Sequence, residues 1–536
     1  MTHNFRNNKL LFLLTCFIIH ACVNDDPDPF HDGDCFHLPD DTVVFTSFKE
    51  DSLYLNLYTE DIREVKIPLE CITDYSFERY TWQINLTYAD GLKKSYPYLC
   101  DTFNLSIDTV IVNPGSLAPP TALISFRTPL TRSVAIKVKG KTDKSAEIGN
   151  VFETAATEHE IPVFGLYSNY NNQVELHILD ARGKSILSRE ISIHIGPYER
   201  VQSGEMAVIS NQLDTLQKNR LFLIQNAIYD AAGDVRWYTT HQGQKFFRLE
   251  NNLVGIQVYP YPVREWVFTG ADLVIIDLFG NIVDSFNVPN RLHHEINEKS
   301  PGGNLLVASN SGEYNGISDD TEDLVVEIDR HSGTIIKQWN LAEIFDSLRP
   351  RIWTEGENDW CHLNSIEYDP SDNSLIVSSK LQCFVSKIDY ETGSIKWILG
   401  NHNNWGTEWE DYLLDPLNFD TAVYRDLDWT YVQHMPRITG TGTIMVYDNG
   451  KRRPGGDYSR IIEYFVNESV RSVEKTWEFI IGEGTSTMGS VHLFDDQTIQ
   501  IGHGEDGVVL IVDRDKNILF KGELKTFYRS YDIQFY

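Results

Sequence analysis

The sequence is poor in positive charge. Lys and Arg together number 46 against 77 Asp and Glu, so the 536 residues carry a formal net charge of −31. A surface this acidic repels phosphate backbones, and we expect no nucleic-acid partner. Glycine (35) and proline (20) are not abundant, which excludes collagen-like and low-complexity chains. Beyond the N-terminal leader, no stretch approaches the roughly 18 consecutive apolar residues that a transmembrane helix needs.

Cysteine patterns with a known chemistry are also missing. Seven cysteines stand at positions 16, 22, 35, 71, 100, 361 and 383, with no C-x-x-C pair and no Cys/His cluster at metal spacing. We therefore expect no metal ligands and no cofactor. Setting aside Cys16 and Cys22 leaves five of the seven, so at least one is unpaired if the others bridge. Export permits disulfides, and Cys361 with Cys383 is one candidate pair.

What the sequence does have is material for large cores. Hydrophobic residues make up 41%, with 27 Phe, 26 Tyr and 11 Trp, which excludes disorder along the whole chain. The length predicts about three or four domains.

The N-terminus has the features of an export signal. Arg6 and Lys9 precede an apolar run over residues 10–23. A charged region followed by a short hydrophobic region is typical of a secretory signal. We expect residues 1–21 to be a lipoprotein signal peptide.

Cys22 is the expected lipidation site. The residues from Ile19 to Cys22 resemble a loose bacterial lipobox, and an acidic tract follows at 23–28, similar to the surface-export tether of some Gram-negative lipoproteins. The protein would then be an exported outer-membrane lipoprotein, periplasmic or at the cell surface, with a membrane contact through its N-terminal lipid. Ordinary cleavage near Ala21 is the alternative.

Two β-rich regions precede the C-terminal half. Residues 22–110 combine the acidic tether with an additional β-rich segment. Residues 111–199 carry strand-like runs separated by Asn and Gly turns, the pattern of a small immunoglobulin-like β-sandwich. The runs are Ala122–Phe126, Ser133–Val138, Gln173–Leu179 and Glu190–Ile195.

From residue 200 to residue 536 the chain repeats one unit: an apolar strand ending in an acid, a tight turn with Gly or Asn, and a second strand. Gly and Asn tolerate the positive φ that hairpin turns demand. Six such units predict an all-β fold in which a six-bladed β-propeller follows the sandwich; two packed sheets are the alternative. The acids are Asp230, Asp277, Asp329, Asp389, Glu463 and Asp513, and tryptophans follow at 237, 339, 397 and 477.

Three histidines fall on the strands expected to line the propeller channel. His294, His362 and His434 precede an apolar strand of their units by similar distances, so we expect them in register at one mouth of the channel. Asn364 shares a face with His362 at strand period two, and Lys380 ends the next strand. A mouth lined by three His, an Asn and a Lys suits a compact oxyanion such as sulfate.

Two other chemistries for these histidines are disfavoured. Zinc sites often use three His, but here each comes from a different unit, and Glu295 alone offers a nearby carboxylate at suitable spacing. No G-x-S-x-G elbow occurs, which argues against a serine hydrolase.

Several long motifs cluster around these residues. The longest is Asp359–Pro370, continued by 374–380 and 387–400; others are 293–295, 433–436, 447–450 and 458–460, with 118–122 and 158–166 in the sandwich. They are similar to signatures of the bacterial aryl-sulfate sulfotransferase (arylsulfotransferase) family. The resemblance covers roughly residues 111–536 and leaves 23–110 as an extra segment.

The resemblance implies transfer of a sulfuryl group from an aryl sulfate donor to a phenolic acceptor, without a nucleotide sulfate donor. His434 occupies the motif of the family's nucleophile, which implies a ping-pong scheme through a sulfohistidine. His294, His362 and Asn364 match positions that hold the sulfate oxygens. Lys380 stands where the family usually has Arg, which keeps the charge but loses a bidentate grip.

Two other functional interpretations stay open. A non-catalytic, surface-displayed propeller could bind a sulfated or aromatic ligand, and a metal- or quinone-dependent propeller enzyme is a third option. Met435, at a motif position where small residues are common, is expected to narrow the acceptor pocket. A homodimer is one option for the assembly.

Overall fold

The computed structural model describes residues 42–97 and 105–197 with short gaps, and residues 201–536 apart from 259–272, 289, 312–320, 353–358 and 420–427. The predicted signal peptide, Cys22 and the acidic tract lie outside the described residues. Within the described part of the chain, no helix is long and apolar enough to cross a membrane. The architecture is almost entirely β, with one short α-helix among the described residues, α1 (Leu341–Ile344).

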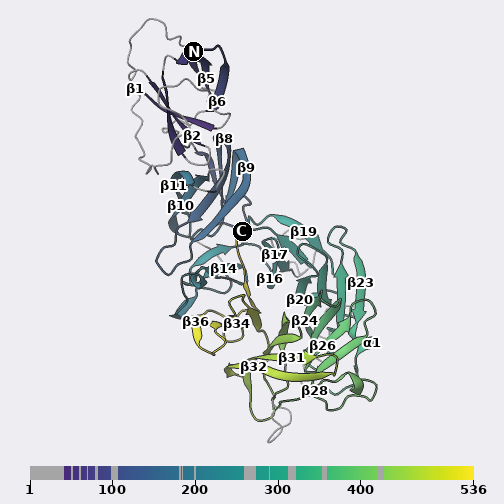
Figure 1. Cartoon of the computed structure of the whole chain (residues 1–536). Helices are drawn as coiled ribbons and strands as arrows, with labels where there is room; N and C mark the ends of the chain where they lie inside the picture. The colour runs from purple at the N-terminus through teal and green to yellow at the C-terminus, as the bar shows by residue number, and fades with distance from the viewer. Residues whose placement is uncertain are drawn as a thin grey trace.

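The N-terminal strands form two three-stranded sheets at one end of an elongated molecule (Figure 1). Strands β1 and β6 of the two sheets contact each other. The strands are β1 (Thr42–Lys49), β2 (Ser52–Tyr58) and β3 (Ile62–Pro68) in one sheet, and β4 (Ile72–Glu78), β5 (Gln83–Tyr88) and β6 (Lys93–Pro97) in the other.

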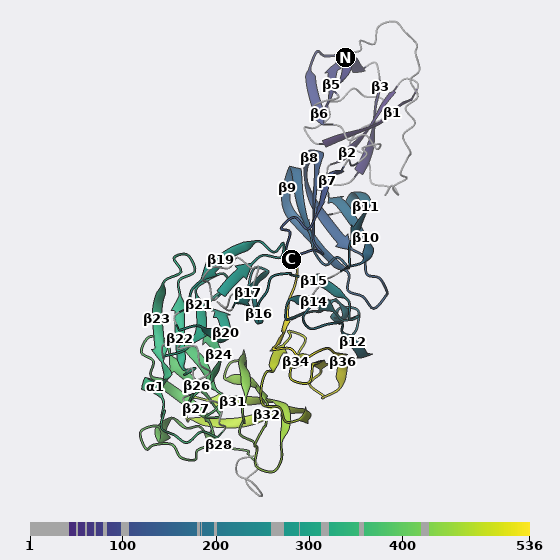
Figure 2. The same ribbon diagram turned by 180° about the vertical axis from the view of Figure 1, so that it is seen from behind.

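The next five strands make the sandwich that separates these sheets from the larger C-terminal unit (Figure 2). The predicted runs 122–126 and 133–138 are one long strand, β8, whose first half pairs with β7 and whose second half pairs with β10. A register shift between Arg127 and Arg132 marks the change of partner. The strands are β7 (Ile107–Val112), β8 (Ala122–Val138), β9 (Ile148–Val163), β10 (Tyr170–Leu179) and β11 (Ser185–Ile195).

Six sheets of four or five strands follow in the described residues. Their innermost strands contact one another in the cyclic order β16, β20, β24, β29, β33, β37 and back to β16. A closed ring of sheets is a propeller, so the prediction of an all-β propeller behind a sandwich is confirmed.

The first blade consists of β13 (Leu221–Ile224), β14 (Ala227–Asp230) and β15 (Val235–Tyr238) with β37 (Ser530–Asp532). The second consists of β16 (Lys245–Leu249), β17 (Leu253–Gln257), β18 (Leu273–Ile276) and β19 (Ile282–Phe286). The third consists of β20 (Leu292–Glu298), β21 (Leu305–Ser309), β22 (Leu324–Ile328) and β23 (Ile335–Asn340). The fourth blade is β24 (Leu363–Asp369), β25 (Ser374–Ser379), β26 (Phe384–Asp389) and β27 (Ile395–Gly400). The fifth is β29 (His434–Gly440), β30 (Thr443–Asp448), β31 (Tyr458–Asn467) and β32 (Ser472–Glu483) with β28 (Asp415–Pro416), and the sixth is β33 (Ser490–Leu493), β34 (Ile499–His503), β35 (Val508–Val512) and β36 (Ile518–Glu523) with β12 (Ala207–Asn211).

Both ends of the propeller chain close the ring. β12, near the start, pairs with β36 as the outermost strand of the sixth blade. β37, at the C-terminus, pairs with β13 as the innermost strand of the first blade. The first and sixth blades therefore each contain strands from both ends of the sequence.

The repeated acid closes the hairpin turn of most blades. Asp329 and Asp389 each accept a backbone N–H bond from the residue three positions on, at 2.8 Å. Gly333 and Gly393 then take φ of 68° and 73°, a region that glycine enters at little steric cost. Glu463 is the exception, since it lies in the middle of β31 rather than at a turn, and its carboxylate binds Arg514 of the sixth blade at 3.0 Å.

The repeated tryptophan ties each of four blades to the next. The indole N–H of Trp237 donates to Leu278 O in the following blade at 2.7 Å, and Trp339 donates to Tyr390 O at 3.1 Å. Trp397 and Trp477 donate likewise to acceptors in the fifth and sixth blades. The tryptophan that recurs in four of the repeated units therefore also bonds one unit to the next.

The sandwich is fixed to the first blade by a buried ion pair. Arg236 and Asp230 have fully buried side chains 2.8 Å apart, and Arg236 also donates to Gly165 O and Ala146 O of the sandwich. The C-terminal residue takes part as well, because the Tyr536 hydroxyl accepts from Phe164 N at 2.9 Å.

We expect Trp237→Phe to lower the free energy of unfolding by about 1–3 kcal/mol, because the buried Leu278 carbonyl loses its donor. Chemical denaturation monitored by circular dichroism would measure the change. Leu348→Ala, at a side chain that is 92% exposed, is the control and should leave stability unchanged. Equal stability of Trp237→Phe and the parent would show that the indole bond does not hold the blades.

Candidate functional site

The predicted site residues gather where the innermost strands begin. His434 is the first residue of β29, His362 directly precedes β24, and His294 lies near the start of β20. The rings of His294 and His362 are 4.6 Å apart. The positive charges of Lys380 and His362 both act on the His434 ring. The structure thus brings these residues together at one mouth of the channel.

The same backbone irregularity occurs at this mouth in three consecutive blades. His294, His362 and Met435 have φ of 42°, 52° and 46°, the left-handed region that non-glycine residues seldom enter. Strand pairing shifts register beside each of them. Such bulges redirect side chains and commonly border functional sites.

The expectation that the three histidines are in register is wrong for His362. Ile296 pairs with Val307 and Ile366 pairs with Val377, each two residues after His294 and Asn364. Asn364 is therefore the structural equivalent of His294. His362 lies two residues further toward the mouth, because it precedes the first paired residue of β24, Leu363, whereas His294 lies within the bulge of β20.

His434 is held with one ring nitrogen available. Its Nδ1 lies 2.7 Å from Asn449 Oδ1. The Asn449 amide nitrogen donates to Thr485 Oγ1 and to the Met488 carbonyl, so the amide oxygen must face the histidine. Nδ1 therefore carries the proton, and Nε2 keeps its lone pair.

The environment of His434 keeps the imidazole neutral. The side chain is 2% exposed, and burial together with the charge of Lys380 lowers the pKa of His434 well below its usual range. The bond from Asn449 opposes this shift without reversing it. A buried neutral imidazole with a free Nε2 is a nucleophile at neutral pH.

His362 is held in the opposite protonation state. Its Nδ1 lies 2.8 Å from Asp359 Oδ2 and 3.0 Å from Glu322 Oε2. Burial alone would lower the pKa of His362, but the charge of Glu322 and the bond to Asp359 outweigh it and raise the pKa to about 9. His362 is therefore a cation at neutral pH.

His294 is neutral and is positioned by a third histidine. His293 Nε2 lies 2.8 Å from the Ser309 carbonyl, which leaves its Nδ1 to accept from His294 Nδ1 at 3.1 Å. Burial and the charge of Lys245 lower the pKa of His294 well below its usual range. The backbone oxygen of His294 accepts from the Tyr528 hydroxyl at 2.8 Å.

Asn364 and Lys380 complete the predicted set, and both are buried. Asn364 donates to the Gln433 carbonyl at 2.7 Å, which ties it to the strand of His434. Lys380 sits in the turn between β25 and β26, where its N–H donates to the His362 carbonyl at 3.2 Å. Its charge acts on His294, His362 and His434.

A buried ion pair between Arg529 and Glu295 contacts the strand of Asn364. Arg529 donates to Glu295 Oε2 at 2.7 Å and to the Asn364 carbonyl at 2.7 Å, and neither charged side chain is more than 1% exposed. Ser365 also donates to Glu295. The nearby carboxylate noted in the sequence is thus committed to an arginine.

Sequence analysis missed several groups at the mouth: Glu322, Asp359 as a partner of His362, Lys245, Tyr528 and Arg529. Asp359 has a local signal, since its Oδ1 accepts the His362 backbone N–H three residues on. Lys245, Tyr528 and Arg529 come from blades without a recognised motif, and Glu322 lies outside the motif of its blade.

Two overlapping clusters could geometrically hold a metal ion: His293, His294 and Glu322, and Glu322, Asp359 and His362. Several of these donor atoms already face one another, as His362 Nδ1 faces Asp359 Oδ2. The absence of a metal stays a prediction.

Two family models match this chain. The arylsulfotransferase (ASST) model covers residues 201–514, and the arylsulfotransferase Ig-like domain model covers residues 109–196. The chain belongs to the arylsulfotransferase family. The resemblance drawn from the sequence motifs is thereby confirmed.

Curated relatives in the family have low sequence identity to this chain, but the matches extend over most of its length. An arylsulfate sulfotransferase of Escherichia coli is 25% identical over 518 residues, covering 73% of this chain and 86% of the relative. One of Lelliottia amnigena is 24% identical over 481 residues, covering 70% and 80%. A solved auxiliary nutrient binding protein from Bacteroides thetaiotaomicron is 12% identical, covers 80% of this chain and 91% of its own, and has a TM-score of 0.31.

The predicted Cys361–Cys383 disulfide of this arylsulfotransferase family member is wrong. Both cysteines are free and buried, in different hydrophobic clusters. Cys383 Sγ accepts from Val432 N, just before β29 of the next blade, at 3.3 Å and lies 3.4 Å from the Lys380 carbonyl of its own turn. Cys71, by contrast, is disulfide-bonded.

We expect both thiols to resist alkylation in the native protein. Burial raises the pKa of Cys383 to about 12 and that of Cys361 well above its usual range, and only thiolates react quickly. Iodoacetamide without reductant, followed by peptide mass spectrometry, should label Cys361 and Cys383 only after unfolding. A disulfide-linked peptide pair after unfolding would contradict the structure.

Proposed function

We propose that this arylsulfotransferase moves a sulfuryl group from an aryl sulfate to a phenolic acceptor in two steps, through a sulfated His434. Family membership supports arylsulfate sulfotransferase activity. The observation that carries the mechanism is the Asn449 amide, whose fixed orientation leaves His434 Nε2 with a lone pair at the channel mouth.

In the first step, His434 Nε2 attacks the sulfur of the donor. An N–S bond forms, the S–O bond to the aromatic ring breaks, and a phenolate leaves. The neutral state of His434 is what makes this attack available without prior removal of a proton. In the second step the acceptor oxygen attacks the same sulfur, and His434 returns to its neutral form.

The positive groups stabilise the sulfuryl oxygens in both steps. His362, a cation held by Glu322 and Asp359, and Lys380 supply charge where negative charge accumulates. Asn364 places an amide between these groups and the strand of His434. Because the side chains are fixed by buried bonds, little reorganisation is needed during the reaction.

A non-catalytic function would use the same cations to hold a sulfated or aromatic ligand. The nucleophile-like tautomer of His434 gives no advantage to such a protein. We therefore favour sulfuryl transfer over ligand binding alone.

We further propose that the protein is exported as a lipoprotein, with a lipid on Cys22. The charged and apolar N-terminal run supports this proposal. Loss of membrane association in Cys22→Ser would test it.

We expect 4-nitrophenol release from 4-nitrophenyl sulfate to depend on an added phenol and to fall in His434→Ala by on the order of 10⁴-fold or more, as loss of a nucleophile does. Absorbance of 4-nitrophenolate measures the rate. With donor alone, the intact mass of the parent should rise by one sulfuryl group, and that of His434→Ala should not.

His331→Ala, at an exposed turn, is the matched control and should keep full activity. Release that is independent of phenol would indicate a sulfatase. No release with any of several donors, together with binding of 4-nitrophenyl sulfate, would favour the non-catalytic function.

We expect Glu322→Gln to move the alkaline limb of the pH profile to lower pH. The raised pKa of His362, about 9, keeps its charge below that pH and loses it above. Without the Glu322 carboxylate, its contribution to the raised pKa of His362 is lost while burial still lowers that pKa, so the cation is lost at a lower pH than in the parent. The profile of kcat/KM against pH measures this shift. Glu391→Gln, on an outer turn, should leave the profile unchanged, and an unmoved limb in Glu322→Gln would refute the role of His362.

A further inference from the structure

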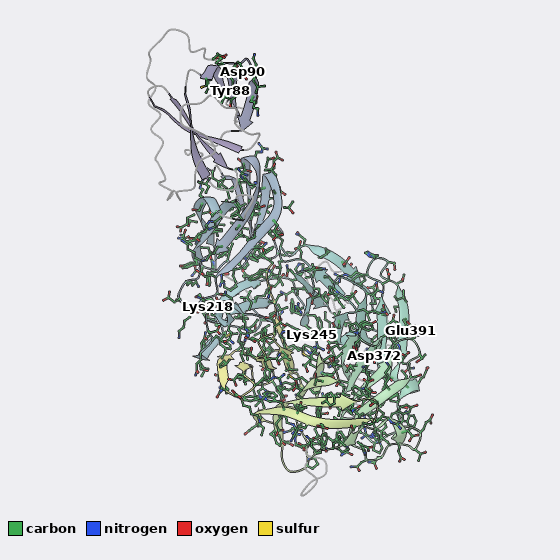
Figure 3. The ribbon with its side chains drawn as sticks, in the orientation of Figure 1. Tyr88, Asp90, Lys218, Lys245, Asp372 and Glu391 are labelled. Atoms are coloured by element: carbon green, nitrogen blue, oxygen red, sulfur yellow. The ribbon has the colours of Figure 1, made fainter. Side chains whose placement is uncertain are left out.

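A lysine that no motif singled out faces the proposed site from the second blade. Lys245 is the first residue of β16, the innermost strand of its blade, and its side chain is half-buried. Figure 3 shows it in the middle of the propeller, whereas Glu391 lies near the outer edge. The ammonium is 4.5 Å from the centre of the Tyr528 ring, and the Tyr528 hydroxyl binds the backbone of His294.

The order of the blades places Lys245 across the channel from His434. In the cyclic order of innermost strands, β16 and β29 are separated by two strands on either side, β20 and β24 one way and β33 and β37 the other. Strands so related lie at opposite points of the ring. The residue that begins β16 therefore faces the residue that begins β29.

Opposite is where the leaving oxygen must be. In an in-line displacement at a tetrahedral centre, the attacking and leaving atoms lie on opposite sides of the reacting atom. With His434 Nε2 attacking from the fifth blade, the aromatic oxygen points toward the second blade. His294 and Asn364, on the strands between, lie beside the remaining sulfuryl oxygens.

Two other cations described near this position are less suited to the role. The Arg529 guanidinium is committed to Glu295 and to the Asn364 carbonyl. Lys380 belongs to the fourth blade, adjacent to that of His434. Of these three described cations, Lys245 is the one on the side from which a phenol departs.

We propose that Lys245 gives a proton to the phenolic oxygen of the departing group and takes one from the acceptor phenol. In the first half-reaction the N–S bond forms at His434, the S–O bond breaks, and an ammonium proton of Lys245 passes to the phenolate, leaving a neutral amine. In the second, the amine takes the hydroxyl proton of the acceptor as its oxygen bonds to sulfur and the N–S bond breaks. Protons and charges balance over the cycle, and no other reactant is needed.

The groups facing Lys245 fit both halves of this role. Burial has the largest effect on its pKa and lowers it, as do the charges of Arg529 and Lys380, whereas those of Glu322 and Glu295 raise it. The result is a pKa of about 8, from which the amine is accessible near neutral pH. A general acid or base works best with a pKa near the operating pH.

This inference rests on the proposed transfer through His434, and the test separates the two. The parent and Lys245→Met are compared with two donors whose leaving groups differ in acidity. 4-Nitrophenyl sulfate releases 4-nitrophenolate, a stable anion, whereas phenyl sulfate releases unsubstituted phenol, whose pKa resembles that of tyrosine, about 10. The first half-reaction is isolated in a single turnover with donor and no acceptor. There we expect Lys245→Met to lose about 10²–10⁴-fold in the rate of phenol release from phenyl sulfate, the usual contribution of a general acid. Single-turnover release of 4-nitrophenol from 4-nitrophenyl sulfate should fall far less, because its leaving group needs no proton.

Lys245→Arg keeps the charge but cannot lose a proton. We expect it to behave as Lys245→Met toward phenyl sulfate, which distinguishes proton transfer from simple charge. Lys337→Met is the matched control, because Lys337 also lies over a tyrosine ring, at 4.2 Å from the centre of Tyr390, on the outer strand β23. It should change neither rate.

The outcomes are distinct. If the parent shows no phenol-dependent transfer, or if His434→Ala retains it, the proposed function itself fails. If the parent transfers as expected and Lys245→Met slows single-turnover release from both donors equally, or Lys245→Arg restores the parent single-turnover rate with phenyl sulfate, the proton-transfer role of Lys245 is refuted. Circular dichroism and the rate with 4-nitrophenyl sulfate show whether the Lys245 variants are folded.

Discussion

Closure of the ring is the constraint on which the rest of this structure depends. Two strand pairs, β12 with β36 and β37 with β13, join the two ends of a long chain, and both rely on partners some 300 residues away in the sequence. Only a closed ring fixes the six innermost strands around one axis. Lys245, His294, His362, His434 and Arg529 come from five of these strands or the segments just before them, so their spacing is a property of the ring rather than of any one blade.

The protein is acidic overall, but the channel mouth carries positive charge. Two acidic side chains there pair with a histidine and keep it protonated. Glu322 and Asp359 keep His362 charged, whereas His434, which is more deeply buried and bonded to a neutral amide, stays uncharged. Two residues of one type thus acquire opposite protonation states from their neighbours. The surrounding ion pairs, such as Arg529 with Glu295, hold the strands without changing these states.

The sequence predicted the fold class well, since the acid–turn unit recurs in six copies, four of them followed by tryptophan, and motifs identified His294, His362, Asn364, Lys380 and His434. It failed where distance along the chain does not determine geometry. His362 precedes the first paired residue of its strand whereas His294 lies within a bulge, and Glu463 matched the repeat but lies in mid-strand. The cysteine pair was suggested by proximity in sequence, which does not tell on which side of a blade a side chain packs. Lys245, Glu322 and Arg529 come together only when the ring of blades closes, so no local sequence pattern predicts them.

The position of β37 has a consequence for how the protein is made. The innermost strand of the first blade lies within the last seven residues, and Tyr528 and Arg529, which contact the mouth, directly precede it. During synthesis the first blade lacks its innermost strand until residues 530–532 have been made, some 300 residues after β13, so a shorter nascent chain has no assembled mouth. A truncation before Ser530 would remove the strand that closes the ring and, with it, the bond between Tyr536 and Phe164 of the sandwich.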